Sequence, residues 1–281
     1  ISDECGLMFP IIPANSATVS GNTEGIFGFG YSGSRVGMTN LVTNAGVVGS
    51  DVAAVGTGRN DLAACEYGED KGIFGFGYNG GYAGMTNLVT NAGVVASDVA
   101  AVGTPRSSLA ACSYGDDKGI FGFGYVAPAT AMTNLVTNAG VVGSDVAGVG
   151  TARFEVKACE YGEDKGIFGF GYDNVAGSKV GMTNLVTNAG VVATDVAAVG
   201  TARSGPAACS YGGDKGIFGF GDTGSPGGYT GATNLVSNTG VVASDVAAVG
   251  TAREKPAATQ YGGNKGIFGY GHDGSNRVSI T

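Results

Sequence analysis

One aspartate and one arginine recur at fixed places along the chain, and these are the side chains with the clearest capacity for chemistry. The aspartates are Asp51, Asp98, Asp145, Asp195 and Asp245, and the arginines are Arg59, Arg106, Arg153, Arg203 and Arg253. A set of carboxylates could bind cations or act as general acid and base. Because strongly interacting charges are often architectural, we interpret them as ion pairs between neighbouring repeats and as turn hydrogen bonds.

Side chains for catalysis are otherwise sparse. His272 is the only histidine, so no Ser/His/Asp constellation can be assembled from near-identical repeats. Four cysteines occupy equivalent positions, and Thr259 takes that position in the last repeat, so we expect small buried free thiols rather than nucleophiles or metal ligands. They are Cys65, Cys112, Cys159 and Cys209. The sequence therefore predicts neither an enzyme nor a cofactor.

Two weaker motifs do not fit their context. Gly28-x-Gly30-x-x-Gly33 matches a dinucleotide fingerprint in its letters, but a strand follows where that site needs a helix. The loop acids Asp173, Asp222 and Asp273 could hold calcium, but the twelve-residue pattern of a calcium loop is missing. We expect no nucleotide site and no metal site.

A glycine-phenylalanine motif divides the chain into six similar parts. Ile-Phe-Gly-Phe-Gly begins at Ile26, Ile73, Ile120, Ile167 and Ile217, and returns with Tyr for the second Phe at Ile267. A period of about 47 to 50 residues is typical of propeller and kelch-type arrays. The repeat runs nearly end to end, so we predict one all-β domain.

Each repeat predicts a four-stranded blade. In one copy, Ala110–Tyr114, Ile120–Tyr125, Met132–Val136 and Val141–Val149 are short apolar runs separated by Gly-, Asn- and Asp-rich turns. The second run alternates Phe with Gly, which places Phe on one face and Gly on the other. Glycine within a strand costs about 0.5–1 kcal/mol. We expect the Phe side chains of one blade to fill the glycine-lined face of its neighbour and offset that cost.

The order of short motifs within a repeat resembles a kelch repeat. Thr-Ala-Arg, Ala-Ala-Cys, Tyr-Gly and Lys-Gly-Ile-Phe-Gly-Phe-Gly follow one another, and the resemblance spans Ser20 to about Gly271. It implies a β-propeller. The sequence of the repeat is also similar to that of repetitive propeller-type proteins of marine tailed bacteriophages. This resemblance implies a virion or other extracellular location.

Six copies of the motif predict a six-bladed propeller closed by its amino-terminal segment. We expect residues 1–15 to supply the outer strand of the last blade, with a strand at Arg277–Thr281 beside it, which hides the edges that an open array would expose. The predicted blades cover approximately residues 16–57, 58–104, 105–151, 152–201, 202–251 and 252–281.

Composition limits the partners. The net charge is −8 with only 15 Lys and Arg, so a polyanion would be repelled and nucleic acid is not expected. Every hydrophobic run is interrupted well before the roughly 20 residues of a membrane span. We expect no insertion into a membrane.

Sequence differences between the repeats are confined to two segments. One lies between the second and third strands of each blade, and the other leads into each first strand. In a propeller both emerge on the same face, and loops on a rigid scaffold often bind ligands. The predicted binding residues on that face are Arg35, Tyr82, Phe154, Lys179, Tyr229 and Arg277. Free drift of surface loops is the competing interpretation.

We therefore expect a non-enzymatic propeller that binds a partner or forms a structural part of an assembly. The first hypothesis is a tail, fibre or decoration protein of a virion, or a component of another extracellular assembly, with protein partners. The alternative is a secreted lectin-like module that binds surface glycans. A hydrolase or isomerase using the central channel is the third.

Overall fold

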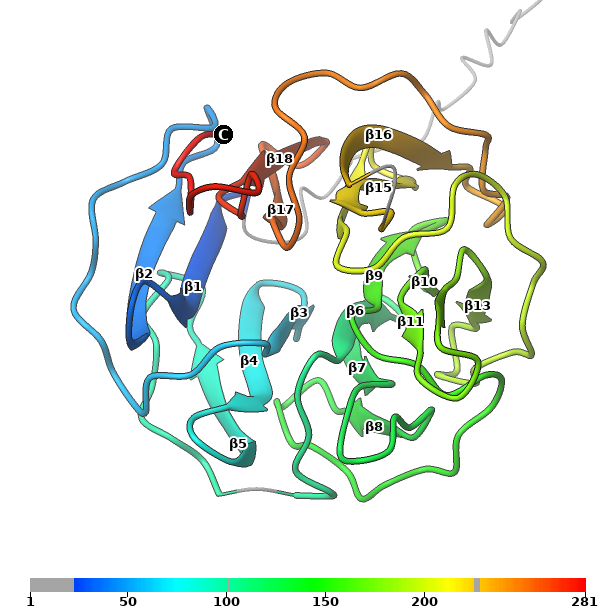
Figure 1. Cartoon of the computed structure of the whole chain (residues 1–281). Helices are drawn as coiled ribbons and strands as arrows, with labels where there is room; N and C mark the ends of the chain where they lie inside the picture. Colours follow the sequence, from blue (N-terminus) through cyan, green and yellow to red (C-terminus); the bar gives the residue numbers. More distant parts are fainter. Residues whose placement is uncertain (1–22, 101, 225–227) are drawn as a thin grey trace, which may run out of the picture.

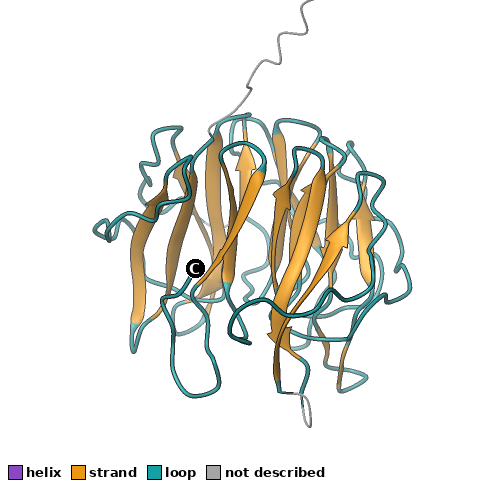
Figure 2. Cartoon of the chain, turned by 90° about the horizontal axis from the view of Figure 1, so that it is seen from above, coloured by secondary structure: helices purple, strands orange, loops and turns teal. Residues whose placement is uncertain are grey.

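The computed structural model describes residues 23–100, 102–224 and 228–281, and within them every regular element is a β-strand. The strands form small antiparallel sheets of two or three strands, and the larger sheets lie around a circle (Figure 1). Seen from the side, the strands run between two ends of the molecule, where the loops gather (Figure 2). The prediction of an all-β chain is confirmed.

The four three-stranded sheets place their strands in the same radial order. An inner strand is followed by a middle strand and then by an outer one (Figure 1). The inner strands are β3 (Ala63–Tyr67), β6 (Ala110–Tyr114), β9 (Lys157–Tyr161), β14 (Ala207–Tyr211) and β17 (Ala257–Tyr261). The middle strands are β1 (Gly25–Tyr31), β4 (Lys71–Tyr78), β7 (Lys118–Gly122), β10 (Lys165–Gly169), β15 (Lys215–Asp222) and β18 (Lys265–Gly269). The outer strands are β2 (Arg35–Val42), β5 (Tyr82–Val89), β8 (Thr133–Val136), β13 (Thr183–Val186) and β16 (Tyr229–Val236).

The predicted fourth strand is wrong. Instead of a continuous strand over Val141–Val149, only Val142 and Val146 bridge to the outer strand β8. The segment between these bridges contains Asp145. Its carboxylate accepts hydrogen bonds from the side chains of Thr104 and Asn134. The described sheets therefore have two or three strands, with an irregular bridged segment outside. A separate short hairpin, β11 (Tyr172–Asp173) and β12 (Ser178–Lys179), extends one loop.

The predicted separation of Phe and Gly onto opposite faces is also wrong. In β4 the register shifts between Gly75 and Gly77, and Phe76 within this bulge has φ of 63°. The bulge turns Phe76 toward the following sheet, while Phe74 faces the preceding one. A left-handed backbone at a non-glycine residue costs about 1–3 kcal/mol. Every second aromatic residue of the motif repeats it, at Phe29, Phe76, Phe123, Phe170, Phe220 and Tyr270.

The expectation that aromatic rings fill glycine positions of the neighbouring sheet is confirmed. A Cβ on Gly122 would lie 2.7 Å from the ring of Phe168 in the next sheet. The inner cysteines pack in the same way, because a Cβ on Gly166 would lie 2.5 Å from the Cys112 Sγ. Any side chain at either glycine would collide with the adjoining sheet. The glycines therefore set how closely neighbouring sheets approach.

The first and last described sheets touch each other through the contacts that join other neighbours. The rings of Phe27 and Tyr270 lie 5.3 Å apart, as the rings of Phe76 and Phe121 lie 5.1 Å apart. The Gly262 N–H donates to the Thr23 carbonyl at 2.6 Å, which matches the bond from Gly68 to Asp117. The expected contribution of residues 1–15 lies outside the described residues.

The last residues run back along β18 without forming a continuous strand. Tyr270 N–H donates to the Ile280 carbonyl at 2.9 Å, and Arg277 bridges to His272. The strand predicted at Arg277–Thr281 is thus reduced to isolated backbone pairing.

Candidate binding surfaces

Both variable segments of the repeats lie at one end of the sheets, which we call the loop face. The segment leading into each inner strand bridges to the end of the middle strand, where the second variable loop begins. Examples are Asn60 with Tyr78 and Phe154 with Tyr172. This pairing places the two variable segments at the same end of the sheets, as expected from the sequence.

The six predicted binding residues all contact another residue of this face, and five of them reach the end of the following middle strand. The Arg35 guanidinium lies over Tyr78, at 4.7 Å from the ring centre, and Nε donates to Asn60. Lys179 Nζ lies 2.8 Å from the Asp222 carboxylate. Arg277 lies over Tyr31, 4.7 Å from its centre, and so joins the last repeat to the first. These residues bridge neighbouring sheets as well as facing solvent.

Tyr229 makes the same kind of contact with the residue that follows the last middle strand, β18. Its ring lies 6.1 Å from that of His272, and its hydroxyl donates to the Glu254 carboxylate at 3.1 Å. His272 Nδ1 accepts a hydrogen bond from the Gly274 N–H of its own loop. The histidine therefore packs and orders a loop.

Aromatic side chains form an unbroken chain across three repeats on the loop face. Tyr78 contacts Tyr82, Tyr82 contacts Tyr125, Tyr125 contacts Phe154, and Phe154 contacts Tyr172, with ring centres 5.1–6.1 Å apart. Such pairs contribute about 0.5–1.5 kcal/mol each beyond their burial. Tyr82 remains 37% exposed. We call Tyr78, Tyr82, Tyr125, Phe154 and Tyr172 the aromatic arc.

The sequence identified two members of the arc and missed three. Tyr78, Tyr125 and Tyr172 stand where the predicted second strands end, a position that the repeat pattern assigns only to a strand. The sequence does contain a sign of these contacts, because the residue that ends a middle strand and the loop of the preceding repeat differ together. Where the strand ends in Asp222 the preceding loop has Lys179, and where His272 follows the strand the preceding loop has Tyr229.

Backbone hydrogen bonds link the connections that lead into successive inner strands at this face. Ser108 N–H donates to Asp61, Glu155 to Ser108, Gly205 to Glu155 and Lys255 to Gly205, over 2.8–3.1 Å. Lys255 and Glu155 add an ion pair of 2.7 Å. This chain of bonds gives the loop face a fixed backbone.

In four sheets a buried arginine and a partly exposed aspartate belong to the same network, so the expected ion pairs between neighbouring repeats are wrong. Arg106 Nη2 donates to Asn134 Oδ1 at 2.7 Å, and Nη1 lies 3.9 Å from Asp145. Both partners belong to the sheet that Arg106 leads into. The contact with the neighbouring sheet is made by the guanidinium face, which lies 4.4 Å from the ring centre of Phe76.

The carboxylates of these networks accept hydrogen bonds from nearby threonine and asparagine side chains. Burial lowers the pKa of Arg106 to about 10, an effect that Asp145 opposes. Asp145 is held ionised by hydrogen bonds from Thr104 and Asn134, which outweigh its partial burial and lower its pKa. The same arrangement surrounds Arg59, Arg153 and Arg203.

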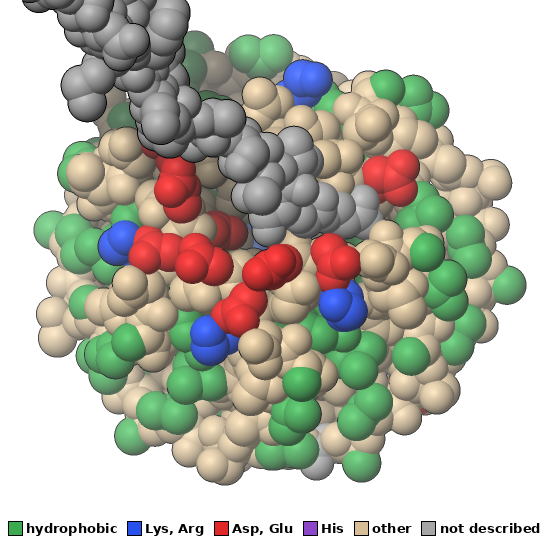
Figure 3. Space-filling model, turned by 180° about the vertical axis from the view of Figure 1, so that it is seen from behind, with side chains coloured by type: hydrophobic (Ala, Val, Ile, Leu, Met, Phe, Trp, Pro, Cys, Tyr) green, Lys and Arg blue, Asp and Glu red, His purple; other side chains and the backbone are tan. Residues whose placement is uncertain are grey.

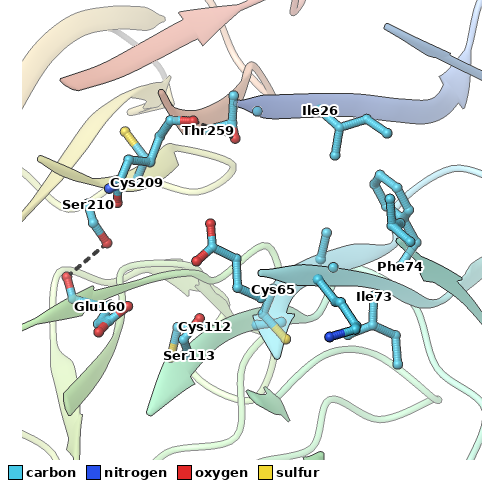
Figure 4. A pocket seen from close by; sticks show the side chains of 18 of the residues that line it. Ile26, Cys65, Ile73, Phe74, Cys112, Ser113, Glu160, Cys209, Ser210 and Thr259 are labelled. Carbon is cyan, nitrogen blue, oxygen red and sulfur yellow. Dashed lines mark hydrogen bonds between the residues drawn. The ribbon is translucent and has the colours of Figure 1, made fainter. Parts of the chain in front are cut away.

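A central pocket, which we call the channel, is lined mainly by residues of the inner strands (Figure 4). At one position successive repeats place Glu66, Ser113, Glu160, Ser210 and Gln260. The channel walls displace water and raise the pKa of Glu160 to about 8, and nearby acids including Glu66 add to the shift. The pKa of Glu66 is also raised by desolvation. The channel thus differs from repeat to repeat, an asymmetry that the near-identical motifs did not suggest.

The four cysteines of the inner strands are free thiols, as predicted. Burial raises the pKa of Cys65 and Cys209 to about 12, so little thiolate forms near neutral pH. Their Sγ atoms face the glycines of the next sheet. Packing accounts for their recurrence.

Acidic side chains gather around the centre of the face opposite the loop face (Figure 3). Four of the five described turns that join inner to middle strands end in Asp-Lys, and the two side chains pair with each other, as in Asp70 with Lys71 at 2.7 Å. Asn91 also donates to Asp70. Each of these lysines offsets the negative charge of the aspartate that it pairs with.

Among the described residues no group of three His, Cys, Asp or Glu side chains is placed to hold a metal ion. The loop acids considered for calcium bond to their own loops: Asp173 accepts from Val175 N–H at 2.8 Å, and Asp273 accepts from Asn276 N–H at 2.7 Å. Asp222 pairs with Lys179. In the same part of the chain, no helix is long and apolar enough to cross a membrane.

Comparison with known proteins gives no relative to guide the assignment. No protein family matches the chain, and no curated protein is significantly similar to it. The function must be argued from the surfaces themselves.

Proposed function

We propose that the chain is a closed, six-bladed, kelch-like β-propeller. The contact between Phe27 and Tyr270 supports closure because it repeats the aromatic contact found between the other neighbouring sheets, such as that of Phe220 with Phe268. The bond from Gly262 to Thr23 and the position of Arg277 over Tyr31 support it at the two ends of the strands. Closure would remove the exposed edges that favour aggregation.

On this scaffold we propose a non-enzymatic binding protein that works within a larger extracellular assembly, such as a virion tail, fibre or decoration. The aromatic arc carries this proposal. Tyr and Arg are enriched where protein interfaces hold most of their binding energy. Tyr78, Tyr82 and Arg35 are already held in place by mutual contact, so little side-chain entropy would be lost on binding. The virion itself is suggested by the motif resemblance alone.

Glycan binding is the second candidate, and the same arc favours it. Exposed aromatic faces with hydroxyl groups at their edges suit the apolar faces and hydroxyls of pyranose rings. Among the described residues, Tyr31 and Tyr82 are the most exposed rings of the loop face. A lectin with one equivalent site per blade is less well supported, since the arc covers only part of the ring.

The two candidates can be separated by experiment. Particles isolated from the natural source with an antibody to the chain should contain it together with other proteins, and recovery only as a free monomer would exclude an assembly role. In parallel, the purified chain should be applied to an array of bacterial surface polysaccharides. If glycans bind at the arc, Tyr82→Ala and Phe154→Ala should weaken binding at least tenfold.

Val191→Ala is a matched control for the array. Val191 is 61% exposed and lies in a turn between an outer strand and its bridged segment, away from the loop face. Equal losses in all three variants would mean that the arc is not the site.

A further inference from the structure

The outermost part of each repeat exposes valine side chains to solvent. They belong to the bridged segments outside the outer strands, residues 43–56, 90–100, 137–150, 187–200 and 237–250, which we call the outer wall (Figure 1). One valine of each segment, such as Val94 or Val141, is 60–64% exposed. Another, five residues further on, such as Val99 or Val146, is 45–48% exposed. Burial within one copy does not explain why valine returns at both positions in all five segments.

The outer wall is almost free of charge. Each of its segments contains one aspartate and no lysine, arginine, histidine or glutamate. The aspartate is bonded within its repeat, as Asp145 is to Asn134 at 2.9 Å. On the face opposite the loop face, hydrophobic side chains lie around the rim, whereas most of the charged side chains gather near the centre (Figure 3). Depletion of charged residues is also typical of the core of a protein interface.

A groove lies in the wall between the first two described sheets. The first repeat contributes Leu41 of β2 together with Val52 and Val55, and the second contributes Ala92 and Val94. The volume of the groove is about 190 Å³. An apolar cavity of about 150 Å³ holds a benzene molecule, so the groove has room for a valine side chain. The exposed apolar surface is thus continuous across two repeats, which is typical of an interaction site rather than of scattered surface residues.

A turn of the second repeat forms one side of this groove. Gly93, in the turn after β5, packs so closely on Leu41 that any side chain at residue 93 would collide with it. Gly140 packs on Leu88 in the same way at the next boundary between sheets. Val94 directly follows this glycine, lines the groove and is still 61% exposed. It therefore projects at the rim of the groove.

We propose that two copies of this chain pack against each other through this groove, with Val94 of each copy seated against Val52 and Val55 of the other. A two-fold contact is made by the same patch on both copies and must be complementary to itself. Here the projecting valine and the groove that can receive it belong to one patch.

Charge also favours a second copy meeting this one at the wall. Each copy has a net charge of −8, and the acidic centre of the face opposite the loop face would repel the same surface of another copy. The wall brings few charges together. The proposal depends neither on a ligand at the loop face nor on closure of the ring, because every residue of the groove belongs to the first two described sheets.

Sedimentation of the purified full chain tests the contact. The natural chain should form a dimer as its concentration rises, and ammonium sulfate should favour the dimer because sulfate strengthens apolar burial. Val94→Lys should raise the dissociation constant of the dimer at least tenfold. This substitution makes the net charge less negative, so repulsion between copies would not explain the loss. Ser34→Lys, at an exposed residue of the loop face, is the matched control and should dimerise like the natural chain.

Two results would overturn the proposal. One is a natural chain that stays monomeric at every concentration, and the other is equal weakening of the dimer in Val94→Lys and Ser34→Lys. Should Val94→Lys fail to fold, Val94→Thr keeps the shape of the side chain and should still weaken the dimer. Only the purified chain is present in these measurements, so their failure would not count against a partner at the loop face.

Cysteine cross-linking tests which residues meet. Chains with Val94→Cys, mixed with chains with Ala53→Cys, should form a disulfide between copies under mild oxidation, identified by its linked peptide, because Ala53 also lines the groove. Chains with Ser34→Cys replace the Ala53→Cys chains in the control and should remain unlinked. Linkage of residue 94 to residue 34 as readily as to residue 53 would reject the proposed packing.

Discussion

The Tyr270 hydroxyl lies 3.4 Å from Asn40 Oδ1, the position at which an arginine guanidinium binds the equivalent asparagine of other repeats. Each arginine precedes the isoleucine of its middle strand by 14 residues, and the residue 14 positions before Ile26 is Ile12. The first repeat thus lacks this arginine. The motif's single change from Phe to Tyr, at residue 270, supplies a hydrogen-bonding group to Asn40 from the neighbouring sheet.

Tyr270→Phe should therefore destabilise the protein although it restores the common motif. Loss of a hydrogen bond to a partly buried amide costs about 0.5–1.5 kcal/mol. Urea unfolding would measure the change. Tyr172→Phe removes a hydroxyl on the loop face for which no hydrogen bond occurs within the described residues and should be nearly neutral; a larger effect there than at Tyr270 would contradict this explanation.

Arg106→Met should be among the most damaging single substitutions. It removes the donor to the fully buried Asn134 and the cation beside the partly exposed Asp145. Leaving a buried amide oxygen without its hydrogen-bond donor costs about 1–3 kcal/mol. Denaturant midpoints would report it.

Arg35→Met is the comparison for Arg106, since Arg35 also stacks on an aromatic ring but is exposed. Its loss should cost no more than about 1 kcal/mol. Similar costs at the two arginines would mean that the buried network contributes little.

Exchanging the charges of Lys179 and Asp222 should restore part of what either reversal loses. Lys179→Asp places two carboxylates together across the sheet boundary, and Asp222→Lys places two ammonium groups there. Each single change should cost about 1–2 kcal/mol, and the double variant should recover a measurable share. Strictly additive losses would show that the pair does not couple the two sheets.

The channel acids predict a fall in stability between about pH 4.5 and pH 8. The folded-state pKa of Glu160 is raised to about 8, so the folded protein holds a proton that the unfolded chain releases at lower pH. The favourable contribution is complete below the unfolded pKa and is lost as pH rises through the folded one. Glu66, with its raised pKa, acts in the same direction.

Glu160→Gln should flatten this dependence and raise the thermal midpoint at pH 8 by a few degrees, since about 1 kcal/mol corresponds to roughly 2–4 °C for a domain of 150–250 residues. Ser113→Ala changes the equivalent channel position without an ionisable group and should leave the pH profile unchanged. An unchanged profile in Glu160→Gln would assign the dependence to other groups.

The sequence predicted the radial strands well because each is a short apolar run bounded by turn residues. The strand predicted at Ala110–Tyr114 coincides with β6, and Met132–Val136 contains β8. The fourth strand failed because the apolar run around Val142 and Val146 is divided by Asp145, whose role becomes evident only when Thr104, far away in sequence, lies beside it.

The orientation of Phe76 could not be read from alternation. A two-residue period assumes a regular strand, and the bulge beside Gly77 breaks that period in favour of a ring contact with the next sheet and a stacked guanidinium. The loop residues were placed on the correct face, but their partners depend on which residue ends the following strand. That information lies about 45 residues away along the chain, as between Arg35 and Tyr78.

The differing contacts on the loop face make the near-identical repeats non-interchangeable. Lys179 matches Asp222, Tyr229 matches His272, and Arg277 matches Tyr31. Shuffling two repeats, or duplicating one through recombination between their similar coding sequences, would juxtapose mismatched loops. The order of the units is thereby specified by the contacts at their edges, independently of whatever the surface binds.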